Sequence, residues 1–345
     1  MRAAVLVLAC AWGPGGLAQD PRAAEFDPPT RAAVDRGLAW LVSKQNPNGS
    51  WTNRVGYKLY DDYFGEDNES VDVTAISGMA LLAGGHVPGR GQYGKHAWKA
   101  VEWLLSKVRD EDGYITHAGS RMYSHAFATL FLAEVYGMTR REVIKPKLKR
   151  AVDLIVNSQN REGGWRYQPI PVDADLSVTV STLQALRAAR NVGIAVPKDT
   201  VARAARYVEN CATRRGFTYQ SVAGYGISDT RVSYALTACG LVSLYSAGQY
   251  DSPRVREALR VLPDWRHTLI PGRLHYYYGH YYAAQAMYVA GGEHWQRYYP
   301  EVKREILRMQ FEDGHWEDDV GPAYATAMAC VILQIPCEYL PIFQK

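Results

Sequence analysis

The chain has 345 residues, of which 47% are hydrophobic and 21% charged, and its formal net charge is +4. The basic residues are dispersed along the chain, which argues against nucleic acid as a partner. Beyond the amino terminus, no stretch approaches the roughly 20 consecutive apolar residues of a membrane-spanning helix, so we expect no transmembrane segment.

The first residues differ in character from the rest of the chain. A basic residue is followed by an apolar run that ends at Trp12, and small residues stand just before Gln19. This order is typical of a secretory signal peptide. We therefore expect a signal over residues 1–18, a short segment over 19–29, and a periplasmic or secreted protein.

Cysteine usage fits an exported protein without a disulfide framework. Cys10 raises the alternative of a lipid anchor, but Leu8 stands where a lipoprotein signal usually has a small residue. The remaining cysteines are few and irregularly spaced, so we expect free thiols. They are Cys211, Cys239, Cys330 and Cys337.

From residue 30 onward, two kinds of segment alternate. Segments of the first kind are charged and apolar on one side only, which predicts outer helices. They cover residues 30–45, 94–108, 143–159, 197–211, 252–264 and 294–310. Segments of the second kind are apolar nearly all round, which predicts buried inner helices. They cover residues 70–86, 122–138, 176–193, 228–247, 275–291 and 321–335.

A short motif, glutamine-x3-glycine-x-tryptophan, recurs between these segments. Its glycine suits a left-handed turn, its glutamine can bond a neighbouring helix end, and its tryptophan can cover the joint. We expect these residues to be structural. The three copies are Gln45, Gly49, Trp51; Gln159, Gly163, Trp165; and Gln310, Gly314, Trp316.

The motif glycines and two degenerate copies recur at about 50 residues, which indicates six helix-pair units. The sequence thus predicts an all-α fold, an α6–α6 toroid forming one domain over residues 30–345. An open solenoid is the alternative, but neither end carries an obvious polar capping repeat. The acidic insertion at 57–72 lacks the spacing of a calcium loop, so we expect a flexible acidic lip.

The motif repeats, the paired helices and the segment Tyr324–Pro336 resemble the squalene–hopene cyclase and protein prenyltransferase β-subunit superfamily. The likeness is to secreted bacterial single-toroid proteins with prenyltransferase and squalene-oxidase repeats. It covers about residues 30–345. The resemblance is specific for the fold and weak for activity, because one fold hosts many functions.

Cyclases of this superfamily protonate an alkene with the middle acid of an Asp-x-Asp-Asp-Thr segment. Aligned on Thr74, this chain keeps only that middle acid, Asp72, and the segment ending at Thr179 keeps only the first, Asp175. Prenyltransferases hold zinc with three side chains, of which His280 alone has a counterpart here. We therefore expect no metal and no cofactor, and we name Asp72 and His280 as the candidate catalytic residues.

Polar and aromatic residues gather where the inner helices begin, which should be one mouth of the toroid. Acids beside aromatic faces suit contacts with carbocations or sugars, although many such acids simply cap helices. His125 and His280 hold similar places in their helices and could face one cavity. The candidate cavity residues are His125, Asp175, Tyr276, Tyr278, Tyr282 and Asp319.

Three functions remain open from the sequence. The first is a non-cyclising toroid that binds a hydrophobic or glycan-like ligand, or an envelope protein, in a wide solvated bowl. The second is a cyclase-like enzyme that uses Asp72 as general acid and requires it to face a closed apolar chamber. The third is a carbohydrate-active enzyme with paired carboxylates, for example Asp175 with Asp319.

Overall fold

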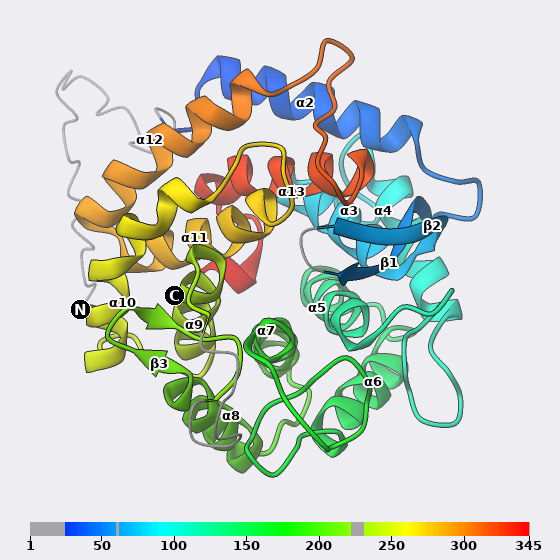
Figure 1. The fold of residues 1–345 in the computed structure, drawn as a ribbon. Helices are drawn as coiled ribbons and strands as arrows, with labels where there is room; N and C mark the ends of the chain where they lie inside the picture. Colours follow the sequence, from blue (N-terminus) through cyan, green and yellow to red (C-terminus); the bar gives the residue numbers. More distant parts are fainter. Residues whose placement is uncertain (1–24, 60–61, 222–230, 345) are drawn as a thin grey trace, which may run out of the picture.

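The computed structural model describes residues 25–59, 62–221 and 231–344. The expected signal peptide, Cys10 and most of the 19–29 segment lie outside these residues. Within them, twelve α-helices form two concentric rings around one axis (Figure 1). The predicted toroid is confirmed.

The outer ring consists of α2 (Pro28–Ser43), α4 (Gly94–Ser106), α6 (Lys145–Asn157), α8 (Lys198–Asn210), α10 (Pro253–Val261) and α12 (Gly292–Arg308). The inner ring consists of α3 (Val71–Ala83), α5 (Met122–Thr139), α7 (Leu176–Asn191), α9 (Tyr234–Ser246), α11 (Tyr276–Ala290) and α13 (Pro322–Gln334). Short 3-10 turns follow α10 and α13, namely η1 (Leu262–Thr268), η2 (Ile335–Cys337) and η3 (Pro341–Phe343). Two two-residue strands, β3 (Ala212–Thr213) and β4 (Gly216–Phe217), follow α8.

Burial explains the two rings. Helix α6 buries a single stripe that includes Leu148, Val152 and Ile155, whereas all but one residue of α3 are buried. A helix covered on all sides must lie between neighbours, and a one-sided helix can form the surface. Small residues let the inner helices approach closely: a Cβ atom on Gly78 would lie 2.4 Å from the Phe131 ring.

Each of the three Gln–Gly–Trp segments joins the outer helix before it to the next outer helix. The Gln159 side-chain amide donates to the carbonyls of Gly163 at 2.8 Å and of Thr200, in the first turn of α8, at 2.9 Å. The indole of Trp165 donates to the carbonyl of Ile155 at 2.7 Å. Gly163 has a φ of +102°, and a Cβ there would lie 2.2 Å from a backbone oxygen of α8.

The other two copies make the same contacts. The amides of Gln45 and Gln310 donate to His96 and Ala33, each near the start of the next outer helix. The indoles of Trp51 and Trp316 donate to carbonyls of the preceding outer helix at 2.7 Å. Each segment is therefore bonded both to the outer helix before it and to the outer helix after it.

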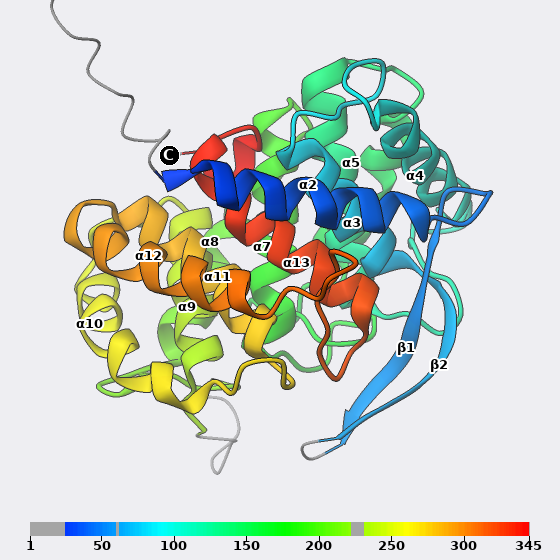
Figure 2. The ribbon, with the colours of Figure 1, turned by 90° about the horizontal axis from the view of Figure 1, so that it is seen from above.

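The ring closes between its first and last units. The Gln310 amide on the last unit reaches the carbonyl of Ala33 on α2 at 2.8 Å. On the same seam, the Asn53 amide donates to the Val320 carbonyl at 3.2 Å. Figures 1 and 2 both show α2 beside α12 and α13. The open-solenoid alternative is therefore wrong.

The acidic insertion has a regular structure, contrary to expectation. It forms an antiparallel hairpin of β1 (Trp51–Leu59) and β2 (Asp62–Ser70), in register from Trp51 opposite Ser70 to Leu59 opposite Asp62. The hairpin leans from the rim toward the axis (Figures 1 and 2). Buried and exposed residues alternate from Trp51 to Arg54 in β1, which is the pattern of a strand with two unlike faces.

The carboxyl-terminal segment covers the other end of the toroid. The backbone N–H of Ile342 in η3 donates to a carboxylate oxygen of Glu134 on α5 at 3.3 Å. The Arg187 guanidinium on α7 donates to the Gln344 carbonyl at 2.7 Å. Figure 2 shows the carboxyl terminus and the hairpin on opposite faces of the ring. The face that carries the hairpin is called the mouth below.

None of Cys211, Cys239, Cys330 and Cys337 is in a disulfide, and the first three are buried, as predicted. No helix among the described residues has the length and apolar character needed to cross a membrane.

Candidate functional site

Four tyrosines and one cysteine gather on the axis just inside the mouth, and we call them the tyrosine floor. The hydroxyls of Tyr123 and Tyr282 lie 3.5 Å apart, and the hydroxyl of Tyr278 lies 3.2 Å from the Cys239 sulfur. Tyr324, which is near enough to raise the pKa of Tyr123, completes the group.

The floor closes the axis at this level. Tyr123 belongs to α5, and Tyr278 and Tyr282 belong to α11, on the opposite side of the ring (Figure 1). The rings of Tyr123 and Tyr278 have centroids 6.1 Å apart. Side chains that meet across the axis fill, at this level, the wide central cavity expected from the sequence.

Burial keeps the floor uncharged. It raises the pKa of Tyr123, Tyr278 and Tyr282 well above the usual range, and it raises the pKa of the Cys239 thiol as well. Three of the residues, Tyr123, Tyr278 and Tyr324, are only partly buried and so keep some surface exposed to solvent. The floor offers aromatic faces and neutral hydroxyls to a ligand.

Asp72 lies at the start of α3 and is partly buried. Its Oδ1 atom accepts hydrogen bonds from the Ser70 hydroxyl and, at 3.1 Å, from the backbone N–H of Val73. A carboxylate in a helix first turn commonly has this role. Among the described residues, no histidine or second acid forms a hydrogen bond or ion pair with Asp72, so the general-acid hypothesis gains no support from its surroundings.

His125 points away from the axis. Its Nδ1 accepts from the backbone N–H of Ile115 at 3.0 Å, and its Nε2 donates to the Ala151 carbonyl of α6 at 3.1 Å. Burial lowers its pKa to about 4, so the ring is neutral with its proton on Nε2. The expectation that it faces the cavity is wrong, because both nitrogens bond the outer layer.

His280 and Tyr276 also face outward, toward α12. His280 Nδ1 lies 2.9 Å from the Tyr298 hydroxyl, and Tyr276 donates to Glu305 at 3.1 Å. Burial, and secondarily the Arg266 charge, lower the pKa of His280 to about 3. The two histidines therefore face different outer helices, and His280 forms no hydrogen bond with a described acid of the mouth.

Asp175 is fully buried at the start of α7, where its Oδ1 accepts from the Val178 N–H at 2.9 Å and from Ser177 at 2.6 Å. Burial raises its pKa. Its second oxygen lies 3.9 Å from Nε of Arg166, which also pairs with Asp173 at 2.8 Å. This carboxylate is a buried helix cap beside an arginine.

Asp319 and Asp318 form the opposite rim. Asp319 accepts from the Leu274 N–H at 2.9 Å and pairs with Arg273 at 3.4 Å. Asp318 accepts from the N–H groups of Val320 and Gly321, and burial raises its pKa to about 7. Asp318 is one of the acids that the sequence places where the last inner helix begins, although only its neighbour Asp319 is among the candidate cavity residues. Its place just before Gly321, at the start of α13, is the signal that could have added it to them.

The candidate residues thus fall into three groups according to where their side chains lie. Tyr278 and Tyr282 meet on the axis, Asp72, Asp175 and Asp319 stand at separate points of the rim, and the others face outward. Among the described residues, no group of three or more histidine, cysteine or acidic side chains is placed to hold a metal ion.

Comparison with known proteins places the chain near two groups of toroids. No protein-family model matches it. Squalene–hopene cyclase of Bradyrhizobium diazoefficiens is 24% identical over 143 residues, which is 39% of this chain and 21% of the cyclase. The chain therefore matches only about a fifth of the length of that curated relative.

Solved structures extend the likeness over the whole ring. A variant of the type II terpene cyclase MstE from Scytonema, in complex with geranylgeranyl dihydroxybenzoate, has a TM-score of 0.59 and 14% identity, covering 93% of this chain and 99% of that one. Cellobiose 2-epimerase from Bacillus thermoamylovorans has a TM-score of 0.63 and 15% identity, covering 88% and 97%. The GH76A α-1,6-mannanase from Salegentibacter has a TM-score of 0.65 and 9% identity, covering 90% and 99%.

At these identities the structural neighbours show the fold alone. They confirm the α/α toroid, and the cyclase match supports the superfamily resemblance seen in the sequence. Proteins of this fold include a terpene cyclase and sugar-active enzymes, so the fold does not distinguish apolar ligands from sugars. The residues of the site must be used to choose between these ligand classes.

Proposed function

We propose that this chain is a terpene cyclase-like toroid that binds an apolar, ring- or hydroxyl-bearing ligand in the bowl above the tyrosine floor, without cyclising it. The observation that carries the proposal is the contact of Tyr123 with Tyr282 across the axis. It turns the centre of the ring into a shallow aromatic seat instead of a deep chamber.

The chemistry of the seat favours an apolar ligand. Partly exposed rings of Tyr123, Tyr278 and Tyr324 supply flat apolar faces, and their hydroxyls give a few oriented polar contacts. Binding sites for small organic ligands have this composition, mostly apolar with a small number of placed polar groups. The terpene cyclase neighbour binds a geranylgeranyl-bearing substrate, which is in keeping with such a seat.

The acids of the rim support binding over turnover. A cyclase acid must be set apart in an apolar chamber, whereas Asp72 accepts hydrogen bonds from Ser70 and Val73. A glycosidase pair needs two carboxylates facing one bond, whereas Asp175 and Asp319 each stand beside an arginine of their own. We also propose that the protein acts outside the cytoplasm, a proposal that rests on residues 1–18 alone.

Binding is tested with purified protein and two classes of probe. Geranylgeraniol and squalene represent apolar ligands, and cellobiose and α-1,6-mannotriose represent sugars, with intrinsic fluorescence as readout. We expect the apolar probes to bind and Tyr278→Ala to weaken them about tenfold, which corresponds to roughly 1.4 kcal/mol. Tyr250→Ala is the control, because Tyr250 lies in a turn on the opposite face and is 43% exposed.

Turnover is tested in the same samples. Mass spectrometry should recover squalene unchanged, and Asp72→Asn should bind as the parent does. Cyclised products that disappear in Asp72→Asn would replace the proposal with the cyclase hypothesis, and binding of sugars alone would refute the apolar seat. Sequencing the amino terminus of exported protein would test cleavage before Gln19.

A further inference from the structure

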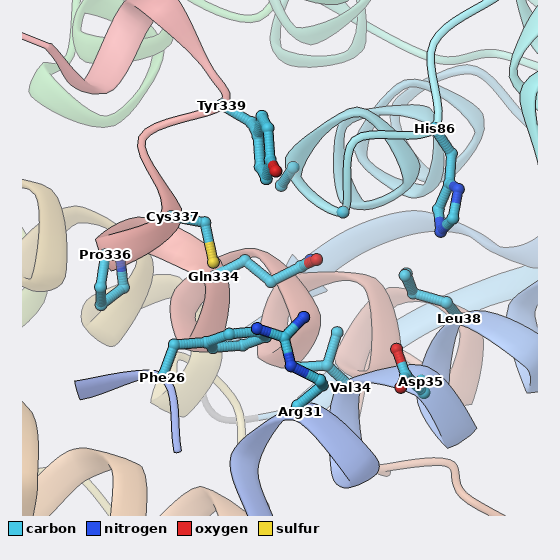
Figure 3. A pocket seen from close by; sticks show the side chains of 12 residues that line it. Phe26, Arg31, Val34, Asp35, Leu38, His86, Gln334, Pro336, Cys337 and Tyr339 are labelled. Atoms are coloured by element: carbon cyan, nitrogen blue, oxygen red, sulfur yellow. The ribbon is translucent and has the colours of Figure 1, made fainter. Parts of the chain in front are cut away.

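A separate cavity of about 310 Å³ lies on the face opposite the mouth (Figure 3). It opens at the seam between the first and last units, where α2, the end of α3 and the segment after α13 meet. Its volume is within the range of small-molecule sites. It shares no residue with the tyrosine floor. Its lining residues are Phe26, Arg31, Val34, Asp35, Leu38, Ala83, Gly84, His86, Gln334, Pro336, Cys337 and Tyr339.

One side of this cavity is apolar, and we call it the apolar floor. Val34, Leu38 and Ala83 are almost fully buried and come from α2 and α3. Phe26 and Pro336 add apolar surface from the two ends of the described chain. Such a floor accepts a hydrocarbon or ring group and excludes water from it.

Two exposed side chains of opposite charge lie at the edge of the cavity. Arg31 and Asp35 stand one helical turn apart on α2 and both line the cavity. The Arg31 guanidinium lies 4.8 Å over the Phe26 ring, and neither side chain forms an ion pair with a described residue. A pair at this spacing usually interacts on a helix surface. Here both groups are available to a ligand.

Gln334 supplies an oriented acceptor. The side chain is only 2% exposed, and its amide nitrogen donates to the carbonyls of Ala80 at 3.1 Å and Cys330 at 2.9 Å. These two bonds fix the oxygen on the other side, where a Cβ on Gly84 would lie 2.9 Å from it. Figure 3 shows this oxygen directed into the cavity, with Arg31 and Asp35 both below it in the view.

We propose that the cavity is a binding site for a free amino acid with an apolar side chain. Arg31 would take the carboxylate, Asp35 and the Gln334 oxygen would take the ammonium group, and the apolar floor would take the side chain. A guanidinium suits a carboxylate because it offers paired donors, and an ammonium group needs acceptors only. The site is independent of the proposed mouth ligand.

The test uses three probes that divide the ligand into its parts. They are L-phenylalanine, phenylacetate, which lacks the ammonium group, and 2-phenylethylamine, which lacks the carboxylate. Isothermal titration of the full chain should show binding of L-phenylalanine at least about tenfold tighter than that of either fragment. If only the phenyl ring were recognised, the three probes would bind with equal affinity.

Two variants assign the ends of the ligand. Arg31→Ala should weaken the binding of L-phenylalanine and phenylacetate about tenfold and leave the binding of 2-phenylethylamine unchanged. Asp35→Asn should weaken the binding of L-phenylalanine and 2-phenylethylamine about tenfold and leave the binding of phenylacetate unchanged. Arg190→Ala, which removes an exposed arginine at the end of α7, is the control and should change nothing. Melting curves of each variant without probe establish that it is folded.

The proposal is overturned if L-phenylalanine gives no heat at millimolar concentration with folded protein. It is also overturned if binding survives both Arg31→Ala and Asp35→Asn, because the charged ends would then lie elsewhere. Loss of binding in Tyr278→Ala, with both cavity variants unaffected, would place the amino acid in the mouth instead.

Discussion

The Nδ1 atom of His125 accepts the backbone N–H of Ile115 at 3.0 Å. In four other units a threonine hydroxyl at the corresponding place accepts the backbone N–H of the aromatic residue that ends the joint. The donor and acceptor pairs are Trp51 and Thr74, Trp165 and Thr179, Phe217 and Thr237, and Trp316 and Thr326. His125 is thus the second unit's form of a recurring contact.

This relationship predicts the behaviour of His125→Thr. Threonine restores an acceptor for Ile115, whereas alanine leaves a buried donor without a partner, so His125→Ala should be less stable than His125→Thr by about 1–2 kcal/mol. Chemical denaturation at neutral pH measures the difference. His267→Ala, an exposed site, is the control. Equal losses for the two His125 variants would contradict the shared role.

The same variant should alter acid sensitivity. The pKa of His125 is lowered from 6.5 to about 4 in the folded state, so its neutral form stabilises the fold above pH 6.5. That contribution is lost as the pH falls through this interval, because the unfolded chain binds the proton first. The melting temperature of His125→Thr should therefore fall less between about pH 7 and pH 4 than that of the parent. A parallel decline would show that the histidine does not titrate on unfolding.

Trp165 should be among the costliest residues to truncate. Its ring is 1% exposed and its indole bonds Ile155, so Trp165→Ala should lose roughly 3–5 kcal/mol of unfolding free energy. Urea denaturation measures the loss, with Ile170→Ala as a surface control because Ile170 is 56% exposed. A parent-like midpoint for Trp165→Ala would mean that the joint does not depend on this ring.

Gly163 and Gly193 allow the cost of a positive φ to be compared with the cost of a steric clash. Gly163 and Gly193 both have positive φ, +102° and +89°. A Cβ on Gly163 would lie 2.2 Å from the Arg203 carbonyl oxygen, and a Cβ on Gly193 would meet nothing within 4 Å. Gly193→Ala should cost about 1 kcal/mol, the penalty of the left-handed backbone, and Gly163→Ala several times more. Similar melting temperatures for the two would show that α8 yields easily.

Glu134 should make the fold less stable in alkali. Burial raises its pKa from 4.5 to about 8 in the folded state, so the unfolded chain releases this proton first and stability falls as the pH rises between these values. Glu134→Gln keeps an acceptor for Ile342 and removes the titration. It should stabilise the protein by about 1–3 kcal/mol near pH 9 and little near pH 5. Exposed Glu312→Gln is the control, and a gain independent of pH would contradict this account.

The sequence predicted the toroid well because burial imposes a strong pattern on each helix. The segment predicted over 176–193 is observed as Leu176–Asn191, and the one over 122–138 as Met122–Thr139. A helix enclosed on all sides carries few charges, and a surface helix carries many on its exposed side. This contrast can be read from the sequence of each helix without knowing which helices pack against it.

The hairpin was missed although its signal was present. Trp51, Asn53 and Val55 alternate with Thr52 and Arg54, which is the period of a strand. The second strand contains many acids, and its charge is a more prominent feature of the sequence than this alternation. In a mostly helical chain, a short two-residue period is easily taken for an irregular loop.

The site was predicted only in part because its members depend on helix rotation. Tyr278 and His280 are neighbours in sequence, yet one reaches the axis and the other contacts α12. A helix that is apolar all round gives no indication of which side faces the centre. For His125 a clue existed, since it occupies the register of Thr74 and Thr179, whose hydroxyls bond the joint.

The closed seam also fixes how many repeats the molecule can hold. The bond from Gln310 to Ala33 joins residues 277 positions apart, so every unit between them must have the right angular width for the two ends to meet. An open array can gain or lose a unit and remain stable by stacking its neighbours. Here a deleted helix pair would leave two apolar faces that no longer touch. Evolution of this chain is therefore free to vary its loops and its bowl, but not its repeat number.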